Sequence, residues 1–549
     1  MENLRLALFA ALGMVLFLLW QAWQQDYGHT PAPQGAGTPP AQTTPAPLER
    51  DLPPAPTTAI ATAPAEPGPE ASGATASVPV RVSTDLLRLE IDTAGGNLRV
   101  VNLPGYPLTV AEPNVPYRLF GDTDGLLFIA QSGLLSAASA PTHHATFAVE
   151  RTDYVLPDGQ DQLEVPLRWV GPDGLSVTKV YRFRRNSYVI GIEYRIENRG
   201  DSPWAGRLYG QFLRGLPEQT SRLFAYTYTG GVLHSEQDPY DKVDFDRMLK
   251  GPVTLDAKGG WAAMIQHYFG AAFIPDPTSI NHLYARALDP QRFLVGVVQP
   301  QVSVPPGEAA VLSLQLYAGP KDQHRLAAVA PGLQLLVDYG YLTIIADPLF
   351  WLLEQIHHFV GNWGWSIVIL TILIKLAFFH LSATSYRSMA RMRNLQPRLL
   401  ALKERYGDDR AKLNQAMMEL YRTEKVNPLG GCLPIVVQIP VFIALYWVLL
   451  ESVELRQAHF MFWIRDLSAY DPYFVLPILM GGTMVIQQRL NPSPLDPIQQ
   501  KVMMILPIVF TVFFLFFPAG LVLYWLVNNT LSILQQWVIT RRLVKEPAS

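Results

Sequence analysis

The sequence predicts a mixed fold: a polytopic α-helical membrane protein of six spans that carries a large extracytoplasmic antiparallel β-sandwich domain. Three observations predict it. Apolar residues are concentrated in the second half of the chain, in runs long enough to cross a bilayer. The region before these runs alternates between apolar and polar residues with the period of a strand. A strongly basic stretch divides the apolar runs and indicates the cytoplasmic side.

The chain begins with an apolar stretch, residues 4–23, that is long enough to span a membrane. No small-residue cleavage site follows it closely, and Trp20 and Trp23 are typical of an interfacial aromatic belt. We therefore expect an uncleaved anchor at residues 1–25 rather than a signal peptide. Residues 26–77 are rich in Pro, Ala, Thr and Gly, which predicts an extended linker without a core of its own.

Residues 78–340 are expected to form the β-sandwich. Apolar and polar residues alternate over residues 190–197, and Asn186-Ser187 just before them suits a hairpin turn. A length of this order fits a large antiparallel sandwich. Three Gly-Gly pairs, at 95–96, 230–231 and 259–260, are expected to separate strands.

Residues 345–361 predict an amphipathic helix that begins at Asp347-Pro348, a good N-cap and first-turn pair, and ends at Gly361. Its apolar positions are Leu349, Leu352, Leu353, Ile356, Phe359 and Val360, and they oppose Glu354, Gln355, His357 and His358. Because a membrane span follows at once, we favour a helix lying in the membrane interface. A helix packed on the β-domain is the alternative.

Five further spans are expected within residues 362–541, at 365–385, 430–450, 473–488, 502–517 and 520–539. The segment between the first two is basic, which places it in the cytoplasm. The C-terminal tail, residues 542–549, follows Arg541 and should lie on the same side, as six spans with a cytoplasmic N-terminus require. The β-domain must then be extracytoplasmic.

The basic segment, residues 386–427, predicts a helical hairpin that turns at Gly407-Asp408 and is too charged to enter the bilayer. Its candidate contact residues are Arg391, Arg393, Arg398, Lys403, Arg405, Arg410 and Lys412. A solvated face that obeys the positive-inside rule needs no partner, so the charge alone does not establish one.

Lys375 is an ionisable residue inside an apolar run, a costly placement that marks a functional site by default. Thr371 precedes it by four residues and shares its helical face. Other spans offer further candidates toward the inner leaflet: Gln438, Phe442, Trp525 and Asn528. We expect these residues to line a hydrated, positively charged groove. The alternative is that Lys375 snorkels to the interface and the amides join helices.

The sequence has few residues that would indicate a disulfide framework, a metal site, nucleotide binding, proton coupling or catalysis. The single cysteine, Cys432, excludes a disulfide framework and a Cys-based zinc site. No phosphate-binding GxxxxGK[ST] loop occurs, and the spans lack internal carboxylates for proton coupling. We expect no catalytic residue, metal or cofactor. Isolated residues such as His234, Glu236 and His267 could serve an enzyme in the β-domain, but such residues are more often ordinary surface or core positions.

Four longer motifs are specific. They are NPLGGCLP at 427–434, SVELRQA at 452–458, DLSAYDP at 466–472 and FTVFFLFFPAGLVLY at 510–524. With these motifs the chain resembles the YidC/Oxa/Alb family of membrane protein insertases, in its Gram-negative form. The resemblance covers residues 345–541, and the anchor, linker and β-domain match more loosely in sequence but well in layout.

The resemblance implies a five-helix insertase core whose groove is open to the cytoplasm and the lipid, and a β-domain similar to galactose mutarotases. It implies Thr371 and Trp525 as contacts of the nascent chain, and Gln438 and Phe442 as part of the third span's substrate face. The groove cation of most relatives is arginine, so Lys375 keeps the charge but loses the two-pronged geometry.

The implied function is that of an insertase and folding chaperone in the bacterial inner membrane, with both termini cytoplasmic and the β-domain periplasmic. The implied partners are nascent membrane proteins, the Sec translocon with its accessory subunits, the ribosome and signal-recognition-particle pathway, and the lipid bilayer. A secondary transporter for an anionic solute, with Lys375 as its binding charge, is the alternative. The missing membrane carboxylates and inverted repeat disfavour it.

Overall fold

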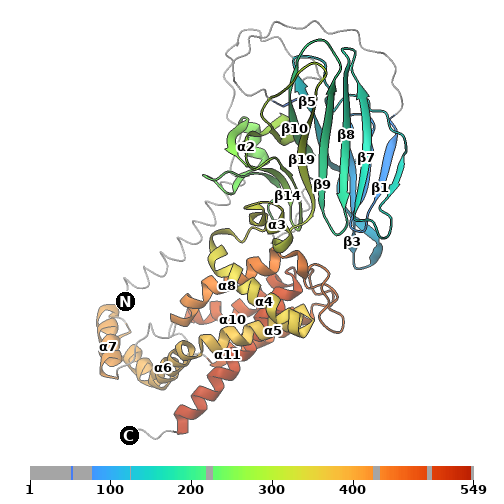
Figure 1. Ribbon diagram of the computed structural model, residues 1–549. Helices are drawn as coiled ribbons and strands as arrows, with labels where there is room; N and C mark the ends of the chain where they lie inside the picture. Colours follow the sequence, from blue (N-terminus) through green and yellow to red (C-terminus); the bar gives the residue numbers. More distant parts are fainter. Residues whose placement is uncertain are drawn as a thin grey trace.

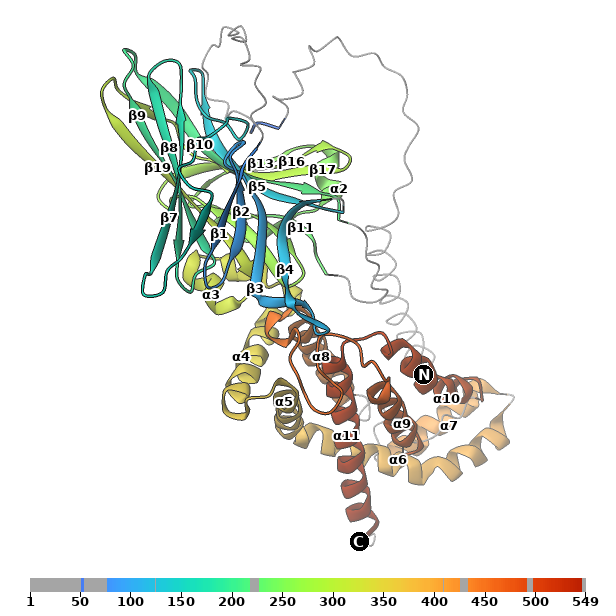
Figure 2. The same cartoon turned by 90° about the vertical axis from the view of Figure 1, so that its right-hand side faces the viewer.

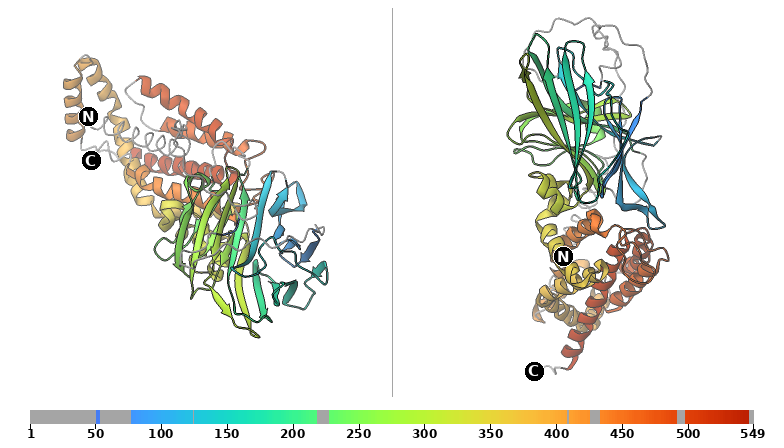
Figure 3. Two further views of the ribbon diagram at one scale, coloured as in Figure 1. Left: turned by 90° about the horizontal axis from the view of Figure 1, so that it is seen from above. Right: turned by 45° about the vertical axis from the view of Figure 1, so that its right-hand side comes forward.

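The computed structural model describes residues 51–53, 77–123, 125–217, 227–407, 409–424, 433–490 and 497–545. The predicted anchor at 1–25 and most of the predicted linker lie outside these residues, as does the end of the tail. Strands fill the described chain up to Pro320, and helices fill the remainder. The two parts lie one above the other, with the sheets at one end and the helices at the other (Figures 1 and 3).

The β-region consists of two sheets packed face to face. The larger sheet has the order β13 (Val253–Lys258), β16 (Ile280–Asp289), β17 (Arg292–Val298), β10 (Trp204–Gly215), β5 (Leu126–Ser136), β4 (Glu112–Thr123), β3 (Leu98–Thr109), β2 (Arg88–Asp92), β1 (Pro79–Ser83), β6 (Asp153–Val155), with β18 (Val302–Val304) beside β10. The smaller sheet has the order β12 (Asp241–Val243), β11 (Gly230–Leu233), β14 (Ala262–Gln266), β15 (Phe269–Ile274), β19 (Ala309–Pro320), β9 (Val189–Asn198), β8 (Leu175–Arg184), β7 (Gln162–Val170).

Neighbouring strands are antiparallel, except that β1 and β6 run parallel. Apolar side chains from the inner faces of the two sheets meet in the core. Phe212 on β10 contacts Phe273 on β15, with ring centroids 4.5 Å apart, and both are fully buried. The predicted antiparallel β-sandwich is therefore confirmed.

The predicted alternation and turn around β9 are confirmed. Ile190, Ile192, Tyr194 and Ile196 are buried, and the alternate residues Gly191, Glu193 and Arg195 are more exposed. Asn186 has φ of +54° in the turn between β8 and β9, a left-handed conformation that Asn tolerates. The pair at 230–231 was predicted wrongly as a separator, because it begins β11. A Cβ at Gly231 would lie 2.9 Å from Cγ2 of Val295, so this strand needs glycine for close packing.

The helices within the β-region, and those in the segment that follows it, are short. They are α2 (Phe245–Lys250), α3 (Gln323–Val329) and the 3₁₀ turns η1 (Leu333–Leu336) and η2 (Gly340–Leu342). The helical region contains α4 (Thr343–Val360), α5 (Trp363–Ala377), α6 (Phe379–Tyr406), α7 (Arg410–Thr423), α8 (Leu433–Glu451), η4 (Val453–Leu455), α9 (Val475–Leu490), α10 (Pro497–Phe514) and α11 (Ala519–Lys545).

The amphipathic helix α4 ends at Gly361 as predicted, with φ of +68° there, but its predicted start is wrong. It begins at Thr343, directly after η2, so Pro348 lies inside the helix. The preceding 3₁₀ turn supplies the first turn, which removes the need for a cap at Asp347. Leu353 and Ile356 are buried as expected. Phe359 is 85% exposed, however, and so lies outside the buried face.

The predicted span at 365–385 is broken. It is divided between α5 and α6, whose axes meet at 67° near Phe378, and α6 then continues to Tyr406 as the first helix of the predicted hairpin. Among the described residues, no single helix is both long enough and apolar enough to cross a bilayer alone. The bent α5–α6 pair has the necessary length and apolar composition only when the two helices are taken together.

The β-region and the helical region meet at a small number of polar contacts. Lys321, just after β19, forms a buried ion pair with Glu451 at the end of α8, with a nitrogen–oxygen distance of 2.9 Å. His267 Nε2 lies 2.9 Å from the carbonyl oxygen of Leu450. Arg456 and Gln457 donate to the carbonyl oxygen of Pro107 in β3, at 2.7 and 2.9 Å.

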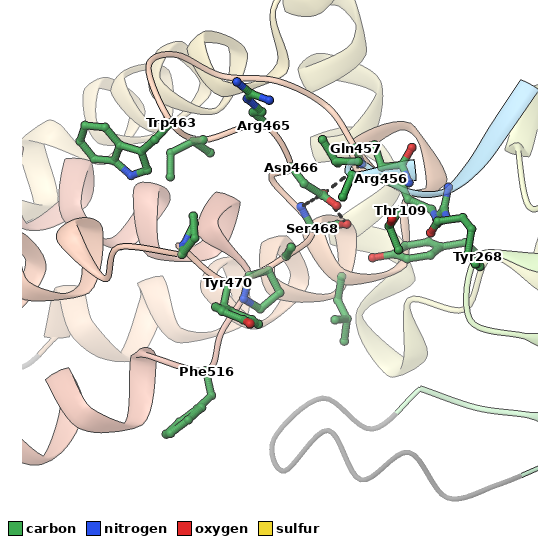
Figure 4. Close-up of a pocket in the computed structure, with 18 residues that line it drawn as sticks. Thr109, Tyr268, Arg456, Gln457, Trp463, Arg465, Asp466, Ser468, Tyr470 and Phe516 are labelled. Atoms are coloured by element: carbon green, nitrogen blue, oxygen red, sulfur yellow. Dashed lines mark hydrogen bonds between the residues drawn. The ribbon is translucent and has the colours of Figure 1, made fainter. Parts of the chain in front are cut away.

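A pocket of about 790 Å³ lies beside these contacts, as Figure 4 shows. Thr109 and Tyr268 line it from the β-region, and Trp463 and Tyr470 line it from the loop after α8. Buried apolar residues of both regions also belong to one connected hydrophobic cluster, so the polar contacts and the pocket lie beside a packed junction.

Candidate functional site

Three helices bring polar side chains together around Lys375. The Nζ atom of Lys375 on α5 donates to Ser532 Oγ on α11 at 2.8 Å, and it lies 3.5 Å from Gln438 Oε1 on α8. Gln438 Nε2 in turn donates to Asn528 Oδ1 on α11 at 2.9 Å. The structure therefore joins Lys375, Gln438 and Asn528, three of the predicted groove residues, into one network with Ser532.

The charge of Lys375 has only neutral partners in this network. No ion pair within the described part of the chain includes this side chain, which is half-buried. A carboxylate partner would cancel the charge, whereas hydroxyl and amide oxygens orient the ammonium group and leave it positive. The site can therefore attract an anionic or polar guest.

An aromatic cluster adjoins the polar network. The rings of Phe442 on α8 and Trp525 on α11 meet edge to face with centroids 4.4 Å apart, and Phe514 on α10 lies 5.4 Å from Trp525. Phe442 follows Gln438 by four residues, and Trp525 precedes Asn528 by three, so each aromatic residue shares a helical face with an amide of the network. A polar guest and an apolar guest would thus find neighbouring surfaces.

Thr371 is a polar predicted groove residue that the described hydrogen bonds do not join to the network around Lys375. Its side chain is 1% exposed, and its Oγ1 donates to the carbonyl oxygen of Ile367 in the same helix at 2.6 Å. Four-residue spacing puts the two residues on one face of α5, but the hydroxyl is already satisfied within its own helix.

Ser532 is a site residue that sequence reasoning missed. Its Oγ accepts from Lys375 and donates to the carbonyl oxygen of Asn528 at 2.7 Å, which fixes the direction of the acceptor lone pair. The sequence feature from which Ser532 could have been predicted is its position four residues after Asn528, on the same face of α11.

The basic hairpin is formed by α6 and α7. Apolar residues Leu395, Leu399 and Met417 pack between the two helices, and Arg398 pairs with Glu424 across them. Figures 1 and 2 show the hairpin and the C-terminal part of α11 at the end of the helical region remote from the sheets.

The predicted contact residues of the hairpin are distributed over both helices. Arg391, Arg393, Arg398 and Arg405 are exposed on α6, Lys403 is half-buried there, Lys412 is exposed on α7, and Arg410 is the first residue of α7. These exposed cations belong to a hairpin that lies remote from the sheets.

The three polar residues considered for an enzyme in the β-domain do not form a site. His234 stacks on Trp261 with a centroid distance of 4.8 Å, and Glu236 is exposed. His267 faces Leu450 at the junction. Among the described contacts, none joins these three residues to one another, and His234 and His267 lie against different neighbours.

Comparison with known proteins covers the whole chain. A family model described as the YidC periplasmic domain matches residues 79–352, and one described as 60Kd inner membrane protein matches residues 355–546. The chain is 53% identical over 554 residues to the membrane protein insertase YidC of Nitrosococcus oceani, covering 100% of both chains. It is 52% identical over 557 residues to that of Methylococcus capsulatus, again covering 100% of both.

A solved structure, an active YidC insertase crystal structure with the first transmembrane domain resolved, aligns with 83% of this chain and 91% of its own at 17% identity, with a TM-score of 0.38.

Proposed function

Because this chain belongs to the YidC family of membrane protein insertases, we propose that it inserts hydrophobic segments of nascent proteins into the bacterial inner membrane through the groove around Lys375. The observation that carries the proposal is the amine of Lys375, which hydroxyl and amide oxygens hold without a carboxylate among the described residues. Membership of this family favours an insertase over the alternative function, a secondary transporter.

The groove lowers the cost of moving the polar flank of a client across hydrocarbon. Transfer of an unpaired polar group into an apolar medium costs several kcal/mol, and the amides of Gln438 and Asn528 replace part of the lost hydration. Lys375 transiently attracts acidic residues of that flank. The membrane potential then assists, by about 2.3 kcal/mol per charge for each 100 mV. No covalent step, nucleotide or metal is needed.

The hydrophobic segment of the client slides along α8 and α10, the predicted third and fifth spans. Exposed apolar side chains support this route: Val437, Ile439 and Ile443 on α8, and Val502, Ile505, Ile508, Val509 and Val512 on α10. The aromatic cluster at Phe442 and Trp525 lies where that surface reaches the polar network.

In this proposal the chain crosses the inner membrane six times, with both termini in the cytoplasm and the β-domain in the periplasm. The positions of the basic hairpin and the sheets at opposite ends of the helical region support this orientation. The hairpin would meet the ribosome and the signal-recognition-particle pathway, and the Sec translocon would share part of the work.

The test is insertion of a short single-span client with an acidic flank into proteoliposomes that contain only this protein. We expect Lys375→Arg to retain insertion, because it keeps the charge. Lys375→Ala should slow insertion by about fivefold or more, the equivalent of roughly 1 kcal/mol of charge attraction in a partly hydrated site. Lys258→Ala, which removes an exposed cation of the β-domain, serves as the control and should insert normally.

Full activity of Lys375→Ala at equal reconstitution would show that the groove charge is dispensable. Failure of the wild-type protein to insert any client alone would make it dependent on another translocon.

A further inference from the structure

Three potential metal ligands converge where the linker meets the β-domain. Asp51 belongs to the linker, and His143 and His144 follow β5. Oδ2 of Asp51 lies 3.0 Å from Nε2 of His143, and its Oδ1 lies 3.1 Å from Nε2 of His144. The three ligating groups all lie within 4.8 Å of one another. We propose that they bind a divalent transition-metal ion, Zn²⁺ by ligand preference, which fastens the linker to the β-domain.

The surroundings of His143 favour a metal ligand. Its side chain is completely buried, and its Nδ1 lies 2.6 Å from Oη of Tyr209. The same Oη accepts the backbone N–H of His143 at 3.0 Å. Histidines that bind metals commonly donate their second ring nitrogen to a neighbouring oxygen, which fixes ring orientation and tautomer. With Nδ1–H donating to Tyr209, the lone pair of Nε2 faces the carboxylate of Asp51, and a cation between these two acceptors satisfies both.

The ligand set and its access fit zinc. Two imidazoles and one carboxylate form a three-ligand set that zinc takes with water in its fourth position. The side chain of His144 is 37% exposed, so an ion and its water can reach the cluster from solvent. The carboxylate offsets half of the ion's charge.

The linker is already held next to this cluster by its backbone. The carbonyl oxygen of Asp51 accepts from Gln211 Nε2 at 2.9 Å, and that of Leu52 accepts from Arg286 Nη2 at 2.5 Å. Pro53 is buried. These hydrogen bonds and the burial of Pro53 hold the linker beside the cluster. A metal ion would turn this contact into a fixed attachment of the linker at Asp51.

The sequence provides a direct readout, because the bond between Arg50 and Asp51 is a trypsin site at the cluster itself. Full-length protein in nanodiscs would be titrated with Zn²⁺ and treated with trypsin. We expect one bound zinc per chain and cleavage after Arg50 that slows by about tenfold or more, since an ion that binds only the attached state suppresses local opening.

The decisive variant is His144→Ala, which removes one exposed ligand and leaves the cleavage sequence unchanged. It should lose both the zinc and the protection, and Asp51→Asn should lose the zinc. His459→Ala, an exposed histidine near the junction, is the matched control and should behave like wild type. Equal zinc binding by His144→Ala and wild type would overturn the proposal, as would zinc binding without protection. The thermal midpoint of each variant verifies that the β-domain remains folded.

Discussion

The hydroxyl of Ser532 gives the Lys375 amine a neutral partner at 2.8 Å. We expect Ser532→Ala to slow insertion by about two- to fivefold, equivalent to roughly 0.5–1 kcal/mol for one neutral hydrogen bond. The effect should be no larger because water can take the place of the lost hydroxyl. The measurement is the initial insertion rate of an acidic-flank client in proteoliposomes.

Thr530→Ala is the matched control for Ser532→Ala. Thr530 lies two residues away on α11, is exposed, and donates only to the backbone of Leu526 in the described contacts. A rate as low as that of Lys375→Ala would mean that Ser532 contacts the client itself. Equal rates for Ser532→Ala and Thr530→Ala would remove it from the site.

Glu454, in η4 after α8, provides a pH-dependent stability effect. Burial, together with the nearby charges of Asp322 and Glu354, raises the pKa of its carboxyl from 4.5 to about 7. Because the pKa is raised in the folded state, the contribution of this carboxyl to the free energy of unfolding is fully present below pH 4.5 and declines as pH rises toward 7. We expect Glu454→Gln to stabilise the protein at pH 8, by up to about 3 kcal/mol, and to change little at pH 4.5.

Thermal midpoints of wild type and Glu454→Gln at pH 4.5 and pH 8 provide the measurement. Glu236→Gln, at an exposed position of the β-domain, is the control and should leave the pH dependence unchanged. A Glu454→Gln variant that is no more stable than wild type at pH 8 would contradict the effect.

Most of the polar network around Lys375 follows from local rules that the sequence displays. A lysine in an apolar run, and amides that share a helical face with an aromatic residue, predicted Lys375, Gln438 and Asn528, and the structure places them in one network. Their roles in insertion remain predictions. Ser532 was missed because a serine in a membrane helix is common and satisfies itself on the backbone. The Asp51 cluster requires contact across more than ninety residues of chain, which spacing rules do not reveal.

At the scale of the elements, the bend between α5 and α6 could not be predicted from pattern. Apolar residues continue past Phe378 without a proline or glycine, so the sequence gives no break. The broken geometry follows from tertiary packing, since α11 contacts both α5 and α6. The hairpin after the bend was predicted because charge and helical spacing persist over many residues.

The packing of α9 against α10 depends on a missing side chain. A Cβ at Gly481 would lie 2.0 Å from Oγ1 of Thr511, which donates to the carbonyl oxygen of Pro507. Gly481→Ala must therefore rotate this hydroxyl away or separate the helices. We expect a loss of about 1–3 kcal/mol, as is usual for overpacking, measured as a lower thermal midpoint in detergent.

The neighbouring residue Gly482 is the control, because a Cβ there meets no atom within 4 Å. Gly482→Ala should be neutral or slightly stabilising, since alanine favours a helix by up to about 1 kcal/mol over glycine. Equal midpoints for the two variants would show that α9 and α10 adjust without cost.

At the scale of the whole molecule, the ion pair between Lys321 and Glu451 joins the β-domain to the helical region. The side chains are 2% and 5% exposed, so removing one partner leaves a buried charge. We expect Lys321→Met to destabilise the protein by about 3–5 kcal/mol, and Lys321→Met combined with Glu451→Leu to recover most of the loss. Thermal midpoints of both single variants and the double variant make a mutant cycle.

If the double variant were as unstable as Lys321→Met, the attraction between the two charges would itself stabilise the protein. Avoiding one unpaired buried charge would then not be the whole effect. The sequence analysis singled out neither residue, and the junction between the two regions explains their burial.

The long helix α6 has a mechanical consequence. At its far end it carries α7, which is clamped to it through Leu395, Leu399 and Met417, and its near end is the bend at Phe378, three residues from Lys375. Its 28 residues, with Pro397 inside the helix, measure about 42 Å along the helix at 1.5 Å per residue. A force applied to the hairpin therefore acts as torque on the bend, with α6 as the lever arm. Rotation of a few degrees there would move the hairpin tip by several ångströms while the groove beside Lys375 shifts far less.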